Sequence, residues 1–266
     1  MRSQALAWWH GSLRAIALLD IVLWSLCAAA VARASALRTG SDPAGCLQLW
    51  LSAGYVAGCA FRCFLPVIDI PRIVLVDSPL SRVAIGRSVA TVAELCFAAQ
   101  WAIALHALAG HSAFVQAASV ALVPLIVVAE GCSWYAVLTT RQRPHAAENS
   151  LWGLAAALVV AAMLAVGARR AAALYPQVIA GGALYVAFIF AYDVPMYWAR
   201  WRADQAQRRK YLSVAEGWLD VRRRWTVSDS WADWQNEVPW MSLYFTFGVW
   251  SSIWLAYASR GIAGVT

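Results

Sequence analysis

"AFVQAASVALVPLIVVAEGCSWYAVLTT", residues 113–140, decides the fold class, because a run of this length contains a single charged residue, Glu130. A transmembrane helix needs about 20 mostly apolar residues. The whole chain agrees: 62% of its 266 residues are hydrophobic and 13% are charged, whereas a soluble domain has about 25% charged residues. The sequence therefore predicts an all-α, polytopic membrane protein.

Further runs of this kind predict a seven-transmembrane-helix bundle that forms a single domain over residues 1–266. The spans are expected at 13–36, 45–66, 85–109, 113–140, 148–173, 177–200 and 239–259. The small residues of "AVARASA", at the end of the first run, are typical of a signal-peptide cleavage site. However, Asp20 interrupts the apolar region and the leading segment is long, so we expect a retained helix.

The basic residues predict the orientation, because they are enriched in cytoplasmic segments. With a cytoplasmic N-terminus, only five of the 21 basic residues fall on the outer side. These five are Arg33, Arg38, Arg169, Arg170 and Arg260. We therefore expect a multi-pass protein of the cell (inner) membrane, with the N-terminus cytoplasmic and the C-terminus outside. The net charge of +7 follows from this topology and requires no nucleic-acid partner.

The longest connection, residues 201–238, is predicted to contain an amphipathic helix between the sixth and seventh spans. Its apolar side chains recur at helical spacing between basic clusters. They are Tyr211, Val214, Ala215, Trp218, Val221 and Trp225. Such a helix either lies on the cytoplasmic surface against anionic membrane lipids or packs, solvated, on the bundle. In the second span, "GYVAG" at 54–58 has the GxxxG spacing that allows close helix contact.

Acidic residues inside the spans are the main functional signal, because a carboxylate in the membrane is costly and marks an internal site. At about 1.5 Å per residue, Glu94 and Asp193 lie about 10 Å from the cytoplasmic ends of their helices, and Glu130 about 16 Å. Asp20 is expected to reach water at the interface, and Glu148 to lie at the cytoplasmic mouth of the fifth span. The sequence therefore predicts a polar cavity open to the cytoplasm.

Aromatic and basic side chains share helix faces with these carboxylates, at steps of three and four residues. We expect them to bind the polar head and the apolar body of a substrate. The residues expected to line the cavity are Arg62, Arg87, Trp101, Trp134, Tyr197 and Glu148. His145, on the short loop before the fifth span, is a further residue that could approach the site.

Each carboxylate also has a structural interpretation. Glu94 could pair with Arg87 or with Arg62 and hold helices together. Asp193 could pair with Arg200 or bind backbone groups freed by Pro195. Glu148 could complement the dipole in the first turn of its helix. These alternatives stay open at the level of sequence.

Several cofactors are not expected. The spacing of the histidines fits neither a haem pair nor a zinc site. There is no aspartate-rich pair at helical spacing for a magnesium-bound diphosphate, and the predicted spans contain no lysine for a retinal Schiff base. We therefore expect a site with no metal and no cofactor.

The carboxylates predict a membrane enzyme that uses acid/base chemistry on a lipophilic substrate such as an isoprenoid. Glu130, the deepest carboxyl group, is the expected acid, and Glu94 or Asp193 accepts a proton or stabilises a developing cation. The reaction would be an isomerisation, a cyclisation or a hydration. The alternatives are a proton-coupled small-molecule transporter and a non-catalytic accessory or receptor subunit. The outer half is poor in ionisable groups and the chain has no visible repeat, which counts against the transporter.

Overall fold

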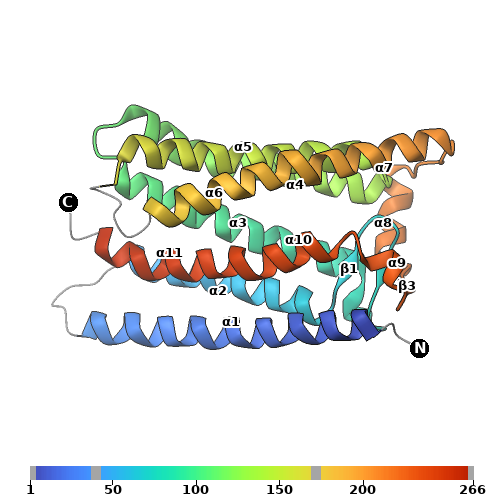
Figure 1. The fold of residues 1–266 in the computed structure, drawn as a ribbon, viewed down its shortest axis with the longest axis horizontal. Coiled ribbons are helices and arrows are strands. Elements are labelled where there is room, and N and C mark those ends of the chain that lie inside the picture. The colour runs from blue at the N-terminus through green and yellow to red at the C-terminus, as the bar shows by residue number, and fades with distance from the viewer. Residues whose placement is uncertain (1–3, 37–42, 169–174, 263–266) are drawn as a thin grey trace. The chain divides into compact units, whose positions relative to one another are not determined.

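The structure of the protein is a computed structural model that describes residues 4–36, 43–168 and 175–262 (Figure 1). It is all-helical, with 83% of the residues in helices. The predicted all-α class is therefore confirmed. The sequence analysis did not predict the small three-stranded sheet that the chain also forms.

Six helices among the described residues are long and apolar enough to cross a membrane, so the chain has the make-up of a multi-pass membrane protein. They are α1 (Gln4–Ala36), α2 (Pro43–Phe64), α3 (Val83–Leu108), α4 (Ala113–Thr139), α5 (Gln142–Val166) and a continuous helix made of α6 (Tyr175–Phe188), the π-helical turn η2 (Ile189–Asp193) and α7 (Val194–Ala206). Their positions agree with the first six predicted spans.

The largest boundary differences are at α1 and α5, which begin at Gln4 and Gln142, earlier than the expected spans. In both cases the early turns contain polar residues that a search for apolar runs leaves out. Pro144 is tolerated at the start of α5, because the first turn of a helix has no partner for its backbone N–H groups. Of the basic residues that predict the orientation, four lie outside the described residues. These are Arg2, Arg38, Arg169 and Arg170.

The seventh predicted span, 239–259, is helical but is divided into shorter segments. It consists of α10 (Val238–Leu243), the π-helical turn η3 (Tyr244–Gly248) and α11 (Val249–Ile262). A π-helical turn inserts a residue into the i→i−4 hydrogen-bond pattern. That this segment crosses the membrane on its own stays a prediction.

The outer faces of the helices are apolar, as a lipid environment requires. On α1, Leu18, Val22 and Leu26 are 56%, 54% and 62% exposed and follow one another at steps of four residues. On α4, Val120 is 71% exposed. In water such stripes would be an association surface, whereas in a bilayer the hydrocarbon solvates them.

The chain forms two compact units. Unit 1 comprises Met1–Gln100 and Arg222–Gly261, and unit 2 comprises Trp101–Val221 and Ile262–Thr266. Unit 1 therefore contains α1, α2, most of α3, and α9 to α11, and unit 2 contains α4 to α7. The prediction of a single transmembrane domain stays a prediction.

In unit 1, α2 and α3 approach each other closely through the glycines of "GYVAG". A Cβ atom at Gly58 would lie 2.6 Å from the Cβ of Ala93, and one at Gly54 would lie 2.9 Å from the Sγ of Cys96. Neither contact leaves room for a methyl group. The close helix contact predicted from the GxxxG spacing is therefore confirmed, and its partner is α3.

Helix α11 is bound to α1 by a hydrogen bond, since the indole Nε1 of Trp250 donates to Oδ1 of Asp20 at 2.8 Å. Asp20 is 2% exposed. The expectation that Asp20 reaches water at the membrane interface is therefore wrong, because the neighbouring helix covers its carboxylate and supplies a donor.

A second polar contact joins α2, α3 and α11 through Gln48, Gln100 and Ser252, all fully buried. Nε2 of Gln48 donates to the backbone oxygen of Gln100 at 2.8 Å, and Nε2 of Gln100 donates to the backbone oxygen of Gln48 at 3.2 Å. Oγ of Ser252 donates to Oε1 of Gln100 at 2.6 Å. These buried groups fix the lateral order of three helices, since unpaired amides would be costly there.

A small sheet closes one end of unit 1 and positions the connection between α2 and α3 (Figure 1). Strand β1 (Val67–Ile68) pairs antiparallel with β2 (Ile73–Val74), and β3 (Thr226–Val227) adds in parallel to β2. The 3₁₀ turn η1 (Pro79–Ser81) then leads into α3, and α9 (Trp231–Trp234) follows β3. The fully buried Trp234 donates its indole N–H to the backbone oxygen of Ser228 at 3.0 Å. The pairing of β2 with β3 thus joins two segments that lie far apart in the sequence.

In unit 2, α5 packs against α4, α6, η2 and α7. Its contact with η2 depends on Gly153, because a Cβ there would lie 2.7 Å from a ring carbon of Phe190 and 2.9 Å from Cγ2 of Ile189. The π-helical turn ends at Asp193, which is buried.

Within the stretch predicted to form an amphipathic helix, the structure has the short helix α8 (Val214–Arg223). Tyr211 and Trp225 lie outside it. Gly217 packs against the backbone carbonyl of Leu138 in α4, where no side chain would fit. Trp218 is 46% exposed. Contact of α8 with a membrane surface stays a prediction.

We predict that Gly58→Ala destabilises the protein by about 1–3 kcal/mol, the usual cost of overpacking. The added methyl group would force α2 away from α3. Gly131→Ala, in α4, is the matched control, because a Cβ there meets nothing within 4 Å. The control should be neutral or slightly stabilising, since alanine favours a helix. Thermal unfolding in detergent measures both. Equal melting temperatures for the two variants would show that α2 and α3 do not depend on this contact.

The start of α8 should depend on pH. The hydroxyl and backbone N–H of Ser213 donate to Oε2 of Glu216 at 2.7 and 2.8 Å, and these bonds lower the pKa of that carboxyl group. A lowered pKa means that the stabilisation is present above the ordinary value of about 4.3 and is lost as the pH falls through the folded-state value. The protection factor of the Ser213 amide, which is the ratio of the exchange rate of an unstructured peptide at the same pH to the observed rate, should therefore fall in acid. Glu216→Gln, which keeps the capping pattern, should show no such dependence.

Candidate functional site

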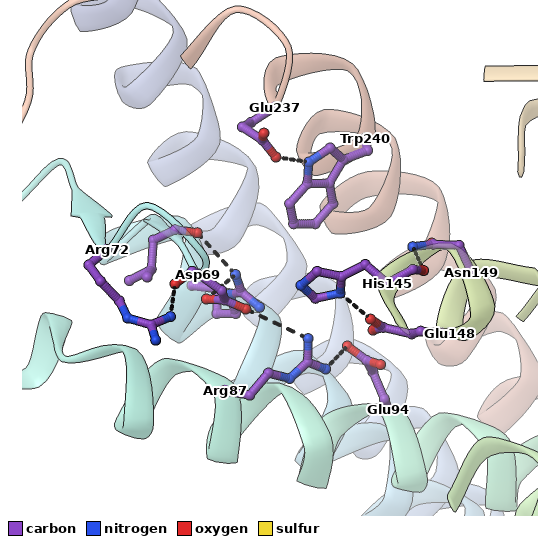
Figure 2. A network of polar contacts seen from close by, with 11 residues as sticks. Asp69, Arg72, Arg87, Glu94, His145, Glu148, Asn149, Glu237 and Trp240 are labelled. Carbon is purple, nitrogen blue, oxygen red and sulfur yellow. Dashed lines mark hydrogen bonds and ion pairs between the residues drawn. The ribbon is translucent and has the colours of Figure 1, made fainter. Parts of the chain in front are cut away.

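Each unit buries a group of ionisable side chains; Figure 2 labels Asp69, Arg87 and Glu94 of the first group and His145 and Glu148 of the second. In unit 1 the group is the arginine–carboxylate network, defined as Arg62, Asp69, Arg87 and Glu94. In unit 2 the group is the glutamate–histidine group, defined as Glu130, His145 and Glu148. The two groups differ in composition, because only the first contains arginine.

The arginine–carboxylate network is a chain of alternating charges. Nη2 of Arg87 donates to Oε1 of Glu94 at 3.1 Å, two helical turns along α3. Nη1 of Arg87 lies 3.8 Å from Oδ2 of Asp69, and Nη2 of Arg62 lies 3.9 Å from Oδ1 of the same carboxylate. Asp69 therefore joins the end of α2 to the start of α3. Both arginines are buried, so each positive charge depends on these partners.

Aromatic and backbone groups complete the surroundings of Arg62. Its Nη2 donates to the backbone oxygen of Val67 at 3.2 Å, and its guanidinium group lies 5.9 Å from the ring centroid of Trp240. Nε1 of Trp240 in turn donates to Oε2 of Glu237 at 2.5 Å. Nη1 of Arg72, in the turn between β1 and β2, donates to the backbone oxygen of Asp69 (Figure 2). The turn that presents Asp69 is therefore fixed from two sides.

The predicted pairing of Glu94 with Arg87 is confirmed, whereas Arg62 binds Asp69. Arg87 and Glu94 were both predicted as site residues, and their ion pair matches the structural alternative for Glu94. The catalytic role of Glu94 stays a prediction.

The glutamate–histidine group brings two carboxyl groups together. Oxygen atoms of Glu130 in α4 and of Glu148 in α5 lie within 4.8 Å of each other. The two residues are 3% and 6% exposed. Two carboxylates at this distance repel each other when both are ionised, and the arrangement is stable when a proton or a cation lies between them.

His145 completes the group. Its Nδ1 lies 2.6 Å from Oε2 of Glu148, one turn along α5, and its ring lies 5.2 Å from the ring of Tyr197 in α7. The guanidinium carbon of Arg200 lies 5.4 Å from the ring centroid of Tyr197. Figure 2 shows the imidazole directed at the Glu148 carboxyl group. The imidazole and the carboxyl group can therefore exchange a proton directly.

The early start of α5 corrects two expectations. His145 lies in the first turn of α5 and not on a loop, and it is buried. Glu148 lies in the second turn, so it does not complement the dipole of the first turn. Both differences arise because the polar residues 142–144 are part of the helix, so that α5 begins earlier than expected.

The other predicted residues occupy separate places. Asp193 is buried at the end of η2. Trp134 of α4 packs against Trp218 of α8, with ring centroids 6.2 Å apart. Trp101, in α3, is half-buried. A single cavity that holds Glu94, Glu130 and Asp193 together stays a prediction.

The residues that could hold a cation in unit 2 are Glu130 and Glu148, because carboxylate oxygens are the ligands that hard cations prefer. Two acidic side chains alone do not specify a metal site. The expectation of a site without a metal stays a prediction.

Sequence analysis missed Asp69 altogether and gave His145 little weight. Asp69 lies in "PVIDIPRI", between two spans, and nothing local indicates that this connection folds back over the helix ends. His145 carried a weak signal, since it lies three residues before Glu148 and so shares its helix face.

Comparison with protein-family models, with curated proteins and with solved structures found no match to this chain. Function is therefore inferred from the chemistry of the two groups.

We predict that Glu94→Gln destabilises the protein by about 3 kcal/mol, the lower end for breaking a buried ion pair, because Asp69 still faces Arg87. Arg87→Met alone should also destabilise. The double variant should recover most of the loss, since it leaves no unpaired charge. A double-mutant cycle on thermal unfolding measures this coupling. Additive effects of the two changes would show that the pair contributes nothing to stability.

Proposed function

We propose that the protein is an integral membrane enzyme that performs acid/base chemistry on a lipophilic substrate, with Glu130 and Glu148 exchanging protons with that substrate. The observation that supports this is the pair itself: two buried carboxyl groups within 4.8 Å, one of them bonded to an imidazole. A pair with different partners can divide the roles of acid and base.

The roles follow from the partners. Glu148 is assigned as the base, because the imidazole of His145 lies 2.6 Å from it and can relay the proton that Glu148 accepts. Glu130, which lies in the neighbouring helix, then serves as the donor. Tyr197 is a positioning residue, since its ring packs on the imidazole and limits its rotation.

An isomerisation illustrates the proposed step. Glu130 delivers a proton to one carbon of a double bond, and a carbocation forms on the neighbouring carbon. Glu148 then removes a proton from the next carbon, and a double bond forms at the new position. Protons and charge balance, and no oxidant or reductant is needed. A hydration would differ only in that water attacks the cation and Glu148 takes its proton.

The proposed setting follows from the sequence. The protein lies in the inner membrane with seven spans, a cytoplasmic N-terminus and an outer C-terminus, and its cavity opens to the cytoplasm. The asymmetry of the basic residues supports this orientation, and the carboxylates that it places in the cytoplasmic half support the position of the cavity. A hydrophobic substrate such as an isoprenoid would enter from the bilayer.

The alternative function is proton-coupled transport, in which the same three side chains relay a proton without changing a substrate. The two functions differ in a measurable way, because only the enzyme makes or breaks covalent bonds of the lipid.

We predict that Glu130→Gln lowers turnover by about 100-fold or more, the usual contribution of a general acid. The amide keeps the shape of the side chain but cannot donate the proton. Membranes that contain the protein are incubated in deuterated water, and the extracted lipids are analysed by mass spectrometry. The wild-type protein should introduce deuterium or one water molecule into a lipophilic compound.

The matched control is Glu216→Gln, which makes the same chemical change at an exposed position and should keep full activity. Thermal unfolding checks that both variants are folded. Full activity in folded Glu130→Gln would contradict the proposal. Proton uptake by vesicles that contain the protein, with no labelled lipid, would favour the transporter.

A further inference from the structure

Unit 2 presents an exposed surface of stacked arginine and aromatic side chains. We call it the arginine–tryptophan surface and define it as Arg141, Arg143, Trp198, Trp201, Arg202 and Tyr211. The guanidinium carbon of Arg143 lies 5.5 Å from the ring centroid of Trp198 and 4.9 Å from that of Trp201. The two indoles meet edge to face at 5.4 Å. The side chain of Arg143 is therefore held in one place although it is exposed.

A second stacked arginine lies beside the first. The guanidinium carbon of Arg141 lies 5.2 Å from the ring centroid of Tyr211, and Nε2 of Gln205 donates to the Tyr211 hydroxyl at 2.9 Å. Stacking uses the flat face of a guanidinium group and leaves its N–H groups, which lie in the plane, directed at acceptors around the edge. Two arginines held by aromatic rings thus lie at the start of α5.

The surface has a strong excess of positive charge. Basic residues follow one another through the end of α7 and beyond it. They are Arg200, Arg202, Arg208, Arg209 and Lys210. The acidic residue among them, Asp204, is buried and accepts a hydrogen bond from Arg209 at 3.3 Å. The start of α5 has no side-chain cap, so the positive end of its dipole adds to the field.

The position of this surface in the helices identifies the partner. It joins the start of α5 to the end of the continuous helix formed by α6, η2 and α7, and both helices are long and apolar enough to cross a membrane. Tryptophan and tyrosine at the ends of such helices lie at the level of the lipid headgroups. The anions at that level are the phosphate groups of phospholipids, so the surface matches a lipid headgroup in both charge and position.

We propose that the arginine–tryptophan surface binds the headgroups of anionic phospholipids, with Arg143 and Arg141 donating to the phosphate oxygens. This binding is independent of the proposed enzymatic activity. It holds the first turn of α5 at a fixed depth in the membrane. That turn contains His145, which lies three residues before Glu148.

The test uses the purified full-length protein in a neutral detergent. Phosphatidylglycerol and phosphatidylcholine with identical acyl chains are titrated in turn, and bound lipid is counted by native mass spectrometry. We expect tighter binding of phosphatidylglycerol. Arg143→Gln should weaken it about fivefold, as expected for one basic residue near an anionic surface, and the added Arg141→Gln should weaken it about fivefold again. Raising the salt concentration should reduce the difference.

The controls separate charge, stacking and free phosphate. Arg33→Gln removes an exposed arginine from the last turn of α1 and should leave phosphatidylglycerol binding unchanged. Arg143→Lys keeps the charge but not the flat, stacked fork, so we expect a partial loss. Inorganic phosphate should displace no more lipid than sodium chloride does at the same ionic strength. Equal binding of both lipids, an equal loss in Arg33→Gln, or a stronger displacement by phosphate than by chloride would each overturn the proposal.

If Arg143→Gln does not yield folded protein, Arg202→Gln takes its place, because it removes an exposed charge from the same surface without disturbing the stacked rings. It should weaken phosphatidylglycerol binding by a similar factor. Unchanged binding in a folded Arg202→Gln protein would overturn the proposal.

Discussion

The cost of burying charge among apolar helices is the constraint on which both units depend. An ionised side chain in this setting needs an opposite charge, a proton or a set of hydrogen bonds close by. In unit 1 the buried carboxylates are paired with arginines, whose positive charge is permanent. In unit 2 the buried groups are a pair of carboxyl groups and an imidazole, and groups of these types can gain or lose a proton. The first arrangement holds charges in place, and the second can move a proton.

Asp69 shows how the fold serves this constraint in unit 1. It contacts both Arg62 and Arg87 from the connection between α2 and α3, and β3, from the C-terminal part of the sequence, pairs with β2 of that connection and holds it in place. The sheet and the buried Trp234 thus have an electrostatic consequence. They place one carboxylate between two helix ends whose guanidinium groups would otherwise repel each other.

In unit 2 the close approach of α5 to its neighbours has the corresponding role. Gly153 allows α5 to lie against the π-helical turn, and the adjoining α7 brings Tyr197 over His145. The same helix pair presents Arg143 to Trp198 and Trp201 at its end. Packing that orients the imidazole therefore also builds the exposed cationic surface, so the two features share one structural cause.

Local patterns in the sequence were sufficient to predict the all-α fold class and the positions of most helices. Runs of apolar residues identified six helices long and apolar enough to cross a membrane, the glycine spacing identified a close contact, and the shared helix face of Arg87 and Glu94 made their ion pair one of the alternatives for Glu94. These features depend on residues within one helix, so periodicity reveals them. Helix starts were less certain, because polar first turns such as that of α5 resemble loops.

Tertiary structure alone decided which side chains meet across helices. The approach of Glu130 to Glu148, the packing of Tyr197 on His145 and the position of Asp69 involve segments separated along the chain. Each depends on the rotation of one helix against another or on the path of a connection. Those are set by the sum of many packing contacts, and no local repeat in the sequence encodes them.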